Sequence, residues 1–228
     1  PFEPMLHADA LLIQADLGPE SEKAARYNQA LALLQATTQR IPYNPAPWQK
    51  MGNIALAQGD TARGIEHLKK AVTIDPKSAD AWSMLGGHYY QTQQWPAALE
   101  AYQTVTRVRP TDSAAWNSQG AVFFQLKRFN ESAQAFSQAV SLKKDDLSAR
   151  LNLMLAQEAS GQYTAAIQSA QEALKVAPDT EKAKLISYIK QLESRAGTPP
   201  NTTDTISTNT LPQANNAAMA AYQQGNTA

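Results

Sequence analysis

The chain repeats itself with a period of 34 residues. Trp48, Trp82 and Trp116 lie 34 residues apart. A glycine follows each tryptophan by four residues, at Gly52, Gly86 and Gly120. Residues of several types that keep one period do not result from composition alone. A period of this length predicts a stack of similar structural units, each too small to bury its apolar face alone.

Prolines mark the ends of these units. They keep the 34-residue spacing at Pro42, Pro76, Pro110 and Pro178. Lys144 occupies the one position of this series that is not a proline. A helix that must turn cannot continue through proline, so these places are predicted loops. Within the unit that begins at Ala79, three and four residues separate Trp82, Leu85 and Tyr89, which therefore share one helix face. Each unit is predicted to be a pair of helices.

The residues at these places resemble the tetratricopeptide-repeat pattern, W-x2-L-G-x2-Y followed by a small residue, an aromatic, an alanine and a proline. Four copies are predicted, over residues 45–78, 79–112, 113–146 and 147–180. The last copy carries Arg150 and Met154 where tryptophan and glycine stand in the others. The resemblance implies an all-α fold, a tetratricopeptide-repeat α-solenoid that forms a right-handed superhelix of antiparallel helix pairs. Capping helices are expected at its N- and C-terminal ends.

Residues 1–44 are interpreted as divergent N-terminal capping helices or a partial repeat. Tyr27, Ala30 and Leu34 fall in the register of a second helix. Gly18-Pro19 interrupts the first helix that should precede it, and residues 5–16 are predicted to form a separate short helix. Because the chain begins at Pro1 and not at methionine, we expect that an upstream segment, such as a targeting sequence or an anchor, was removed.

Residues 181–196 are predicted to form a polar capping helix. Its expected buried side holds Ala183, Leu185, Ile186, Ile189 and Leu192. From residue 197 to 228 the sequence is mostly threonine, asparagine, proline, glutamine and alanine. Such a composition cannot offset the entropy of ordering, which predicts a disordered polar tail.

Composition and motifs exclude most chemistry. The net charge is zero, which argues against a nucleic-acid footprint, and the absence of cysteine excludes disulfides and zinc thiolates. His7, His67 and His88 are too far apart in sequence for local metal-ligand spacing, and His67 is expected on an exposed charged face. No stretch is apolar enough to span a membrane. We therefore predict no catalytic, cofactor-binding or metal-binding residues, no cofactor, and no enzyme.

The resemblance places a binding groove on the first helices of the repeats. Asparagine and glutamine there could pair with a ligand backbone, with Tyr90 and Phe124 as apolar anchors. The alternative is that these two rings pack against neighbouring repeats. The expected groove residues are Gln49, Asn53, Leu56, Ser83, Gly87, Tyr90, Asn117, Ala121, Phe124, Gln125, Leu151, Asn152, Leu155 and Glu158.

The predicted function is a non-catalytic scaffold that holds a protein or peptide. The basic residues with which co-chaperone members of the family grip a carboxylate are missing, which argues against a chaperone-tail adaptor. The composition favours a bacterial assembly or biogenesis factor in the periplasm or anchored outside the cytoplasm, with the cytoplasm as the alternative. Two other readings stay open: a regulatory module of a larger enzyme, and a homo-oligomer in which a terminal segment fills the next groove.

One stability expectation concerns Gly64, which lies in the middle of a predicted second helix. Two other copies carry Ala98 and Ala166 at the same place. Because alanine favours a helix over glycine by about 1 kcal/mol, Gly64→Ala is expected to stabilise the fold.

Overall fold

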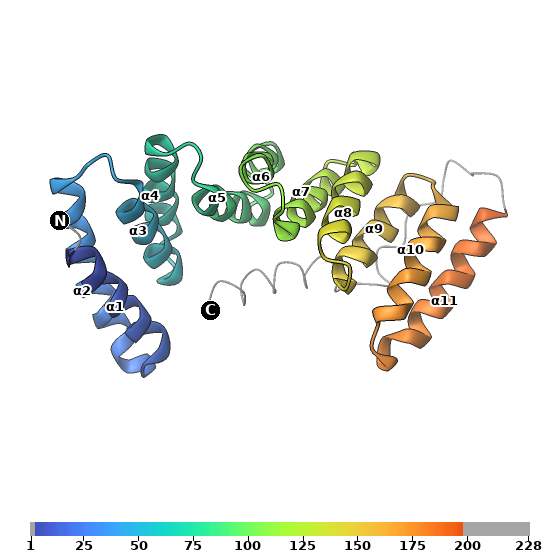
Figure 1. Ribbon diagram of the computed structural model, residues 1–228, viewed down its shortest axis with the longest axis horizontal. Helices are drawn as coiled ribbons and strands as arrows, with labels where there is room; N and C mark the ends of the chain where they lie inside the picture. The colour runs from blue at the N-terminus through green and yellow to red at the C-terminus, as the bar shows by residue number, and fades with distance from the viewer. Residues whose placement is uncertain (1–2, 198–228) are drawn as a thin grey trace. The chain divides into compact units, whose positions relative to one another are not determined.

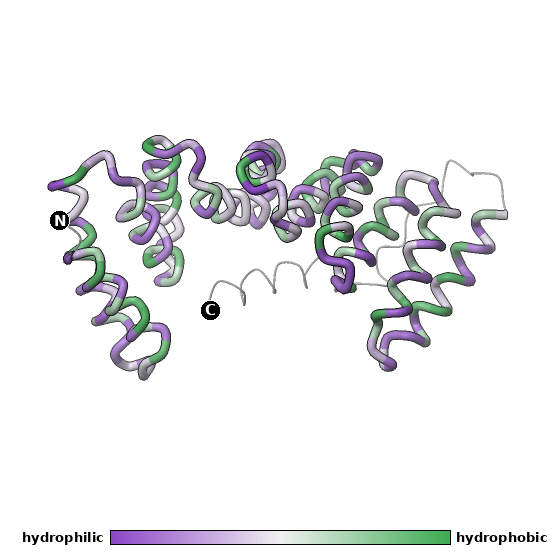
Figure 2. Tube along the Cα trace, in the orientation of Figure 1, coloured by the Kyte–Doolittle hydropathy of each residue, from purple (hydrophilic) through white to green (hydrophobic). Residues whose placement is uncertain are grey.

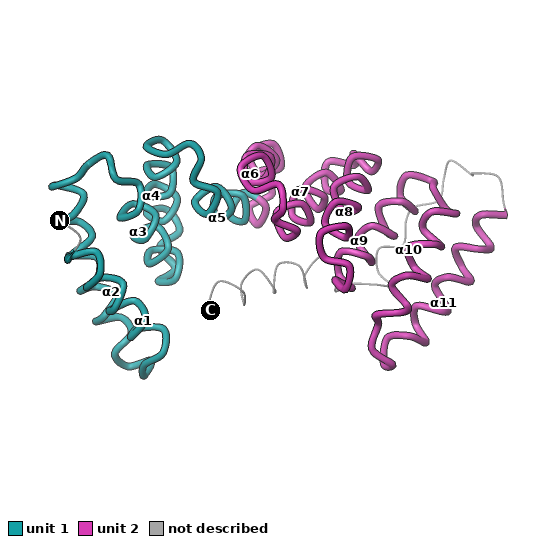
Figure 3. Tube along the Cα trace, viewed as in Figure 1, with its two compact units in different colours: residues 1–89 teal, residues 90–228 magenta. Residues whose placement is uncertain are grey.

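The structure, a computed structural model, describes residues 3–197, and the chain divides into two compact units, residues 1–89 and 90–228 (Figure 1, Figure 3). Every regular element of the described part is an α-helix. The helices are α1 (Glu3–Leu17), α2 (Glu20–Arg40), α3 (Pro45–Ala57), α4 (Thr61–Ile74), α5 (Ala79–Gln91), α6 (Trp95–Val108), α7 (Ser113–Gln125), α8 (Phe129–Leu142), α9 (Leu147–Ala159), α10 (Tyr163–Val176) and α11 (Asp179–Ala196). Successive helices pack as pairs, so the predicted α-solenoid is confirmed. The predicted polar tail, except Gly197, lies outside the described residues.

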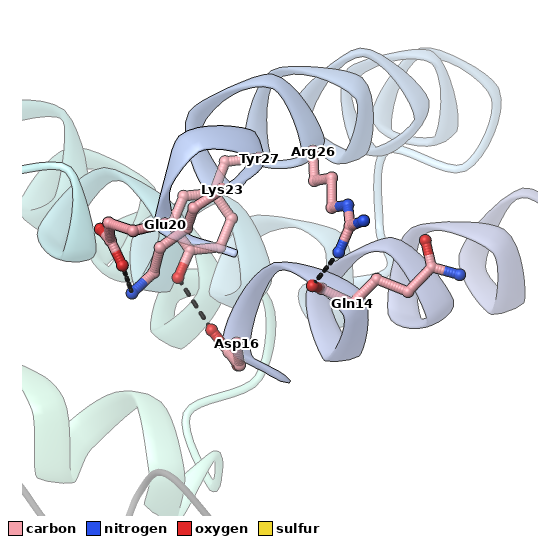
Figure 4. A network of polar contacts seen from close by, with 6 residues as sticks. All are labelled: Gln14, Asp16, Glu20, Lys23, Arg26 and Tyr27. Carbon is pink, nitrogen blue, oxygen red and sulfur yellow. Dashed lines mark hydrogen bonds and ion pairs between the residues drawn. The ribbon is translucent and has the colours of Figure 1, made fainter. Parts of the chain in front are cut away.

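Unit 1 begins with a hairpin of α1 and α2. Ala8, Leu11 and Ala15 on α1 are buried against Tyr27 and Leu34 on α2. Polar contacts fasten the turn end of the hairpin (Figure 4). The Tyr27 hydroxyl donates to the carboxylate of Asp16 at 2.9 Å. This pair then packs on the pair of α3 and α4 through α2 and α3.

The described residues before α3 form one helix pair. The short helix predicted over residues 5–16 is α1, and it is the first helix of a complete pair. Gly18 and Pro19 interrupt the helical stretch, as the sequence indicated, and form the turn between α1 and α2. The repeat pattern did not indicate this pairing, because α1 carries none of the tryptophan and glycine signature of the other first helices.

Unit 2 continues the same construction from α6 to α11, and each helix packs against the next. Helices α7 and α9 begin where aspartates, Asp112 and Asp146, accept hydrogen bonds from the third residue after them. Hydrophobic and hydrophilic bands follow one another along α10 and α11 (Figure 2).

At the start of the first helices, a side chain repeatedly donates a hydrogen bond to the backbone oxygen of the residue six positions earlier. The indole Nε1 of Trp82 donates to the backbone oxygen of Pro76 at 2.9 Å, and that of Trp116 to Pro110 at 2.8 Å. In the last repeat Arg150 replaces tryptophan, and its Nε donates to the backbone oxygen of Lys144 at 2.8 Å. Arg150 thus keeps the contact of the residue that it replaces.

The turns inside the four predicted repeats share a left-handed residue, also with a period of 34. The φ angle is +81° at Gly59 and +78° at Gly161, but +58° at Gln93 and Lys127. A left-handed residue after a helix lets its terminal carbonyls be satisfied, and glycine adopts this conformation without a Cβ penalty. Two of the four turns therefore hold a side chain in an unfavourable conformation.

The repeats fill the space between first and second helix in two ways. A Cβ added to Gly120 on α7 would lie 2.8 Å from the ring of Phe136 on α8, so the large ring requires the glycine. One repeat later the same two places hold Met154 on α9 and Ala170 on α10, both fully buried. The large and the small residue have exchanged helices, which explains the departure of the last copy from the pattern.

Gly64 on α4 does not have the free space that the sequence indicated. A Cβ there would lie 2.7 Å from both Cγ and Cδ2 of Leu56, well inside van der Waals contact. In the other repeats the residue at the place of Leu56 is Tyr90, Phe124 or Glu158, none of which branches at Cγ into two methyl groups. The comparison with Ala98 and Ala166 was therefore misleading.

The capping helix α11 starts at Asp179, two residues before the predicted start. Leu185, Ile189 and Leu192 are buried as expected. Ala183 and Ile186 are exposed, in contrast to the prediction. The half-buried Tyr188 packs against the core in their stead.

Candidate functional site: the inner residues of the first helices

The predicted groove residues are described in two rows, one for each unit. The unit 1 row consists of Gln49, Asn53, Leu56, Ser83 and Gly87. Asn53 alone among these five is exposed, whereas Gly87 is buried. Leu56 is half-buried and packs against the cluster around Leu68 and Leu85. The Oε1 of Gln49 accepts a hydrogen bond from the Ser78 hydroxyl at 3.4 Å.

In unit 2, side-chain amides connect residues of successive first helices. The Nε2 of Gln125 on α7 donates to the hydroxyl of Tyr90 at 3.4 Å. The Nδ2 of Asn152 on α9 donates to Oδ1 of Asn117 on α7 at 3.1 Å. The unit 2 row, which is the remaining nine predicted residues, is Tyr90, Asn117, Ala121, Phe124, Gln125, Leu151, Asn152, Leu155 and Glu158. These two hydrogen bonds join four of its members in two pairs.

The two aromatic rings of this row are half-buried and packed within their own repeats. Tyr90 meets Trp95 edge-on with 5.2 Å between ring centroids, and Phe124 meets Phe129 in the same way at 5.2 Å. Both rings also border the cluster around Phe136. Burial raises the pKa of the Tyr90 phenol, and the contact with Gln125 lowers it by less. The rings therefore contribute to packing as well as to the surface.

Glu158 takes the place of these rings in the last repeat, and it is buried. Its carboxylate accepts hydrogen bonds from the Tyr188 hydroxyl and from Nη1 of Arg195, both on α11. The Arg195 guanidinium also lies over the Tyr163 ring at 5.2 Å from its centroid. Glu158 and Tyr163 occupy the same repeat positions as Phe124 and Phe129, which lie 34 residues earlier. In the last repeat Arg195 contacts both residues, whereas in the preceding repeat the two phenylalanine rings contact each other directly.

Comparison with known proteins agrees with this geometry. Family models described as "Tetratricopeptide repeat" match residues 55–122 and residues 113–146. This chain belongs to the tetratricopeptide-repeat family. No curated protein matches it. Members of the family are built as scaffolds that bind other proteins.

Solved structures share the fold of this tetratricopeptide-repeat protein. The structure titled "Crystal structure of MamA protein" is 22% identical, with a TM-score of 0.62 over 78% of this chain and 94% of that chain. A second, "Crystal structure of MamA", is 24% identical, with a TM-score of 0.61 over 72% of this chain and 95% of that one. A third, "MamA AMB-1 P212121", is 21% identical, with a TM-score of 0.63 over 78% and 96%. At these identities the likeness establishes the fold alone.

Four residues of the unit 2 row are less accessible than the tetratricopeptide pattern implied. Asn117, Ala121, Asn152 and Glu158 are all buried, and Asn152 is 2% exposed. Gln125 is exposed, and Phe124, Leu151 and Leu155 are half-buried. A ligand could therefore reach Gln125 and the apolar residues beside it, whereas the buried amides hold α7 and α9 together.

Sequence reasoning missed the two α11 residues that cover Glu158. Tyr188 and Arg195 lie outside the 34-residue pattern, so no register pointed to them. One signal was present: Glu158 is the only acidic residue among the fourteen predicted groove residues, and a charge at a mostly apolar place needs a partner when buried.

His67 also differs from its expectation. It is half-buried, and its ring packs against Trp48 with 5.7 Å between centroids. Burial lowers the pKa of this imidazole, and the charge of Arg63 adds to the effect although Glu66 opposes it. Among residues 3–197, no three histidine, aspartate or glutamate side chains are grouped as metal ligands would be. None of the described helices is long and apolar enough to cross a bilayer.

Proposed function

We propose that this tetratricopeptide-repeat protein holds a segment of a partner protein along α7 and α9 of unit 2. The observation that carries the proposal is the combination of Gln125, an exposed amide, with the half-buried apolar side chains of Phe124, Leu151 and Leu155. An amide can pair with the backbone of a bound segment, and apolar residues beside it can receive the segment's side chains.

The buried amides support this proposal by fixing the surface in advance. The hydrogen bond from Asn152 to Asn117 joins α7 directly to α9 in a place shielded from water. A binding surface held by such a contact loses little conformational entropy when a ligand arrives. In unit 1 the exposed Asn53 is the corresponding candidate for contact with a ligand backbone.

The proposed process is the assembly or biogenesis of a bacterial structure outside the cytoplasm. Its support is compositional, since the chain has no cysteine and is rich in glutamine, asparagine and alanine. Fractionation of the source cells, with antibody detection in the envelope, periplasmic and cytoplasmic fractions, tests the location. Recovery of the protein in the cytoplasmic fraction would contradict it.

Photo-crosslinking tests the binding surface directly. A photoreactive amino acid at Gln125 is expected to capture one partner in cells, with excess unlabelled protein reducing the yield. The matched control replaces Gln138, an exposed glutamine on the second helix α8. Capture at Gln138 but not at Gln125 would show that the partner uses a different face. With the partner purified, Leu155→Asp is expected to weaken binding by at least about tenfold, because it places a charge where an apolar contact is needed.

A further inference from the structure

Helix α1 carries an exposed apolar stripe, defined by Leu6, Ala10, Ile13 and Leu17. Leu6 is 68% exposed, Ile13 59% and Leu17 83%, whereas no other leucine, isoleucine or valine of the described residues exceeds 44%. The opposite side of α1, with Ala8, Leu11 and Ala15, is buried against α2. The helix is therefore apolar on two sides, and only one of them is covered within the chain.

The other terminal helix of the described chain has a different outer surface. The exposed residues of α11 include Lys184, Ser187, Lys190 and Glu193, and Ile186 is its only large exposed apolar residue. A polar outer face is what a capping helix needs in water. Helix α1 lacks this property, and an exposed apolar stripe of this kind marks an interaction surface.

The stripe is self-complementary. Its spacings are four, three and four residues, so it reads the same from either end. When two copies of α1 lie antiparallel about a twofold axis, Leu6 comes opposite Leu17 of the partner subunit. Ala10 comes opposite Ile13 of the partner subunit, a small residue against a large one. Alternating spacings of three and four are those of a coiled-coil seam, and a surface that matches itself forms a closed, isologous contact.

Two of the three acidic residues beside the stripe are engaged within the chain, and the third, Glu3, is exposed at its N-terminal end. Asp9 forms an ion pair with Lys50 on α3. Asp16 accepts the hydrogen bond from Tyr27 (Figure 4). On the other side the stripe is bordered by His7, Gln14 and Glu3, of which only Glu3 carries a negative charge. The zero net charge of the chain adds no general repulsion between copies.

We propose that the α1 stripe is the contact surface of a homodimer, in which α1 packs antiparallel against α1 of a second copy. This contact uses none of the predicted groove residues, so a failure of the dimer test would leave the proposed binding surface unaffected, and the reverse also holds. It also differs from an open chain in which one terminal segment fills the next groove, because a twofold contact closes on itself.

Sedimentation across a concentration series tests the dimer. The wild-type chain is expected to pass from monomer to dimer as its concentration rises through the micromolar range. Leu6→Glu combined with Leu17→Glu is expected to weaken the dimer at least about a hundredfold, with unchanged helical content because both residues are exposed. The matched control is Ile186→Glu on α11, which should dimerise as the wild type does. A wild-type monomer at all concentrations, or a dimer that survives the double change, overturns the proposal.

Cysteine cross-linking tests the antiparallel geometry. The chain has no cysteine, so each introduced thiol reports one position. A mixture of Leu6→Cys and Leu17→Cys chains is expected to cross-link between the two variants through a short thiol-reactive linker. Leu6→Cys alone should not, because antiparallel packing separates the two Leu6 positions by about 16 Å along the helix axis, from 1.5 Å per residue. Efficient cross-linking of Leu6→Cys to itself, or none in the mixture, contradicts the proposed contact.

Discussion

The guanidinium of Arg150 donates to the backbone oxygen of Lys144, just as the Trp116 indole donates to Pro110 one repeat earlier. The sequence departs from the tetratricopeptide pattern at both Arg150 and Lys144, yet the hydrogen bond between the two places is kept. A loop carbonyl next to a helix start needs a donor, and either side chain provides one.

Arg150→Ala is expected to destabilise unit 2 by about 1 kcal/mol, because the carbonyl of Lys144 loses this donor. Arg150→Trp should recover most of the loss through the indole N–H. Urea denaturation followed by circular dichroism measures both. Arg107→Ala, at an exposed place on α6, serves as the control and should change stability by less than about 0.5 kcal/mol. A tryptophan variant weaker than the alanine variant would show that the two side chains are not equivalent there.

A double-mutant cycle tests whether the large and small residues of α9 and α10, Met154 and Ala170, can be exchanged for the arrangement found in α7 and α8. Met154→Gly alone should cost about 2–5 kcal/mol through the cavity that it leaves. Ala170→Phe alone should cost about 1–3 kcal/mol through overpacking. Together they recreate the arrangement of Gly120 and Phe136, so the double variant should be more stable than the sum predicts by at least about 1 kcal/mol. Additive losses would mean that the ring cannot enter the space left by the methionine.

Gly64→Ala is expected to destabilise unit 1 by about 0.5–2 kcal/mol. The helix-propensity gain of about 1 kcal/mol is offset by the displacement of Leu56, whose side chain occupies the space of the new methyl group. A second change, Leu56→Ala, removes the obstruction, so Gly64→Ala should be stabilising in that background. Thermal melting of the four variants decides the question. A higher melting temperature for Gly64→Ala alone would show that Leu56 moves aside freely.

Lys127→Gly is expected to stabilise unit 2 by about 1 kcal/mol. Lys127 has a φ of +58°, a left-handed conformation that costs a residue with a Cβ about 1–2 kcal/mol. Its side chain is exposed, so little contact is lost. The reverse change, Gly161→Lys, moves a side chain into the same conformation and should destabilise by a similar amount. Equilibrium unfolding in urea should show opposite shifts for the two variants.

Stability should fall at alkaline pH because of two tyrosines. Burial, with a contribution from Asp16, raises the pKa of Tyr27 to about 12. Burial and the hydrogen bond to Glu158 also raise the pKa of Tyr188. A group whose pKa is higher in the folded state stabilises fully below its unfolded value, about 10 for tyrosine, and loses that contribution as pH rises above it.

The unfolding free energy should therefore be flat with respect to these phenols from about pH 7 to 9 and decline above about pH 10. Tyr27→Phe with Tyr188→Phe removes this part of the decline. Urea denaturation at several pH values measures the slope in both chains. An equally steep alkaline loss in the double variant would assign the decline to other groups.

The positions of the first helices could be predicted from the 34-residue period. Helices α3, α5, α7 and α9 begin at Pro45, Ala79, Ser113 and Leu147, the first residues of the four predicted repeats. A repeated pattern reports contacts that every repeat shares, and these contacts build the helix pairs.

Burial of the groove places could not be predicted from the pattern. Glu158 is covered because α11, a helix outside the period, carries Tyr188 and Arg195. Phe124 is half-buried because Phe129 stands five residues later, where the repeat tolerates many residue types. For the same reason Phe124→Ala is a poor probe of ligand binding, since it also removes a ring contact within the fold.

The exchange between Met154 and Ala170 has a consequence for how such chains can recombine. Each helix pair contains its own match of a large and a small residue, and the larger one lies on α8 in one pair but on α9 in the next. A crossover in the loops before Ser113 or Leu147 transfers a whole matched pair. A crossover in the tight turns at Lys127 or Gly161 would join halves from different pairs, either methionine against phenylalanine or glycine against alanine. Gene shuffling among these repeats should therefore leave viable joints at the loops between pairs and fail at the turns within them.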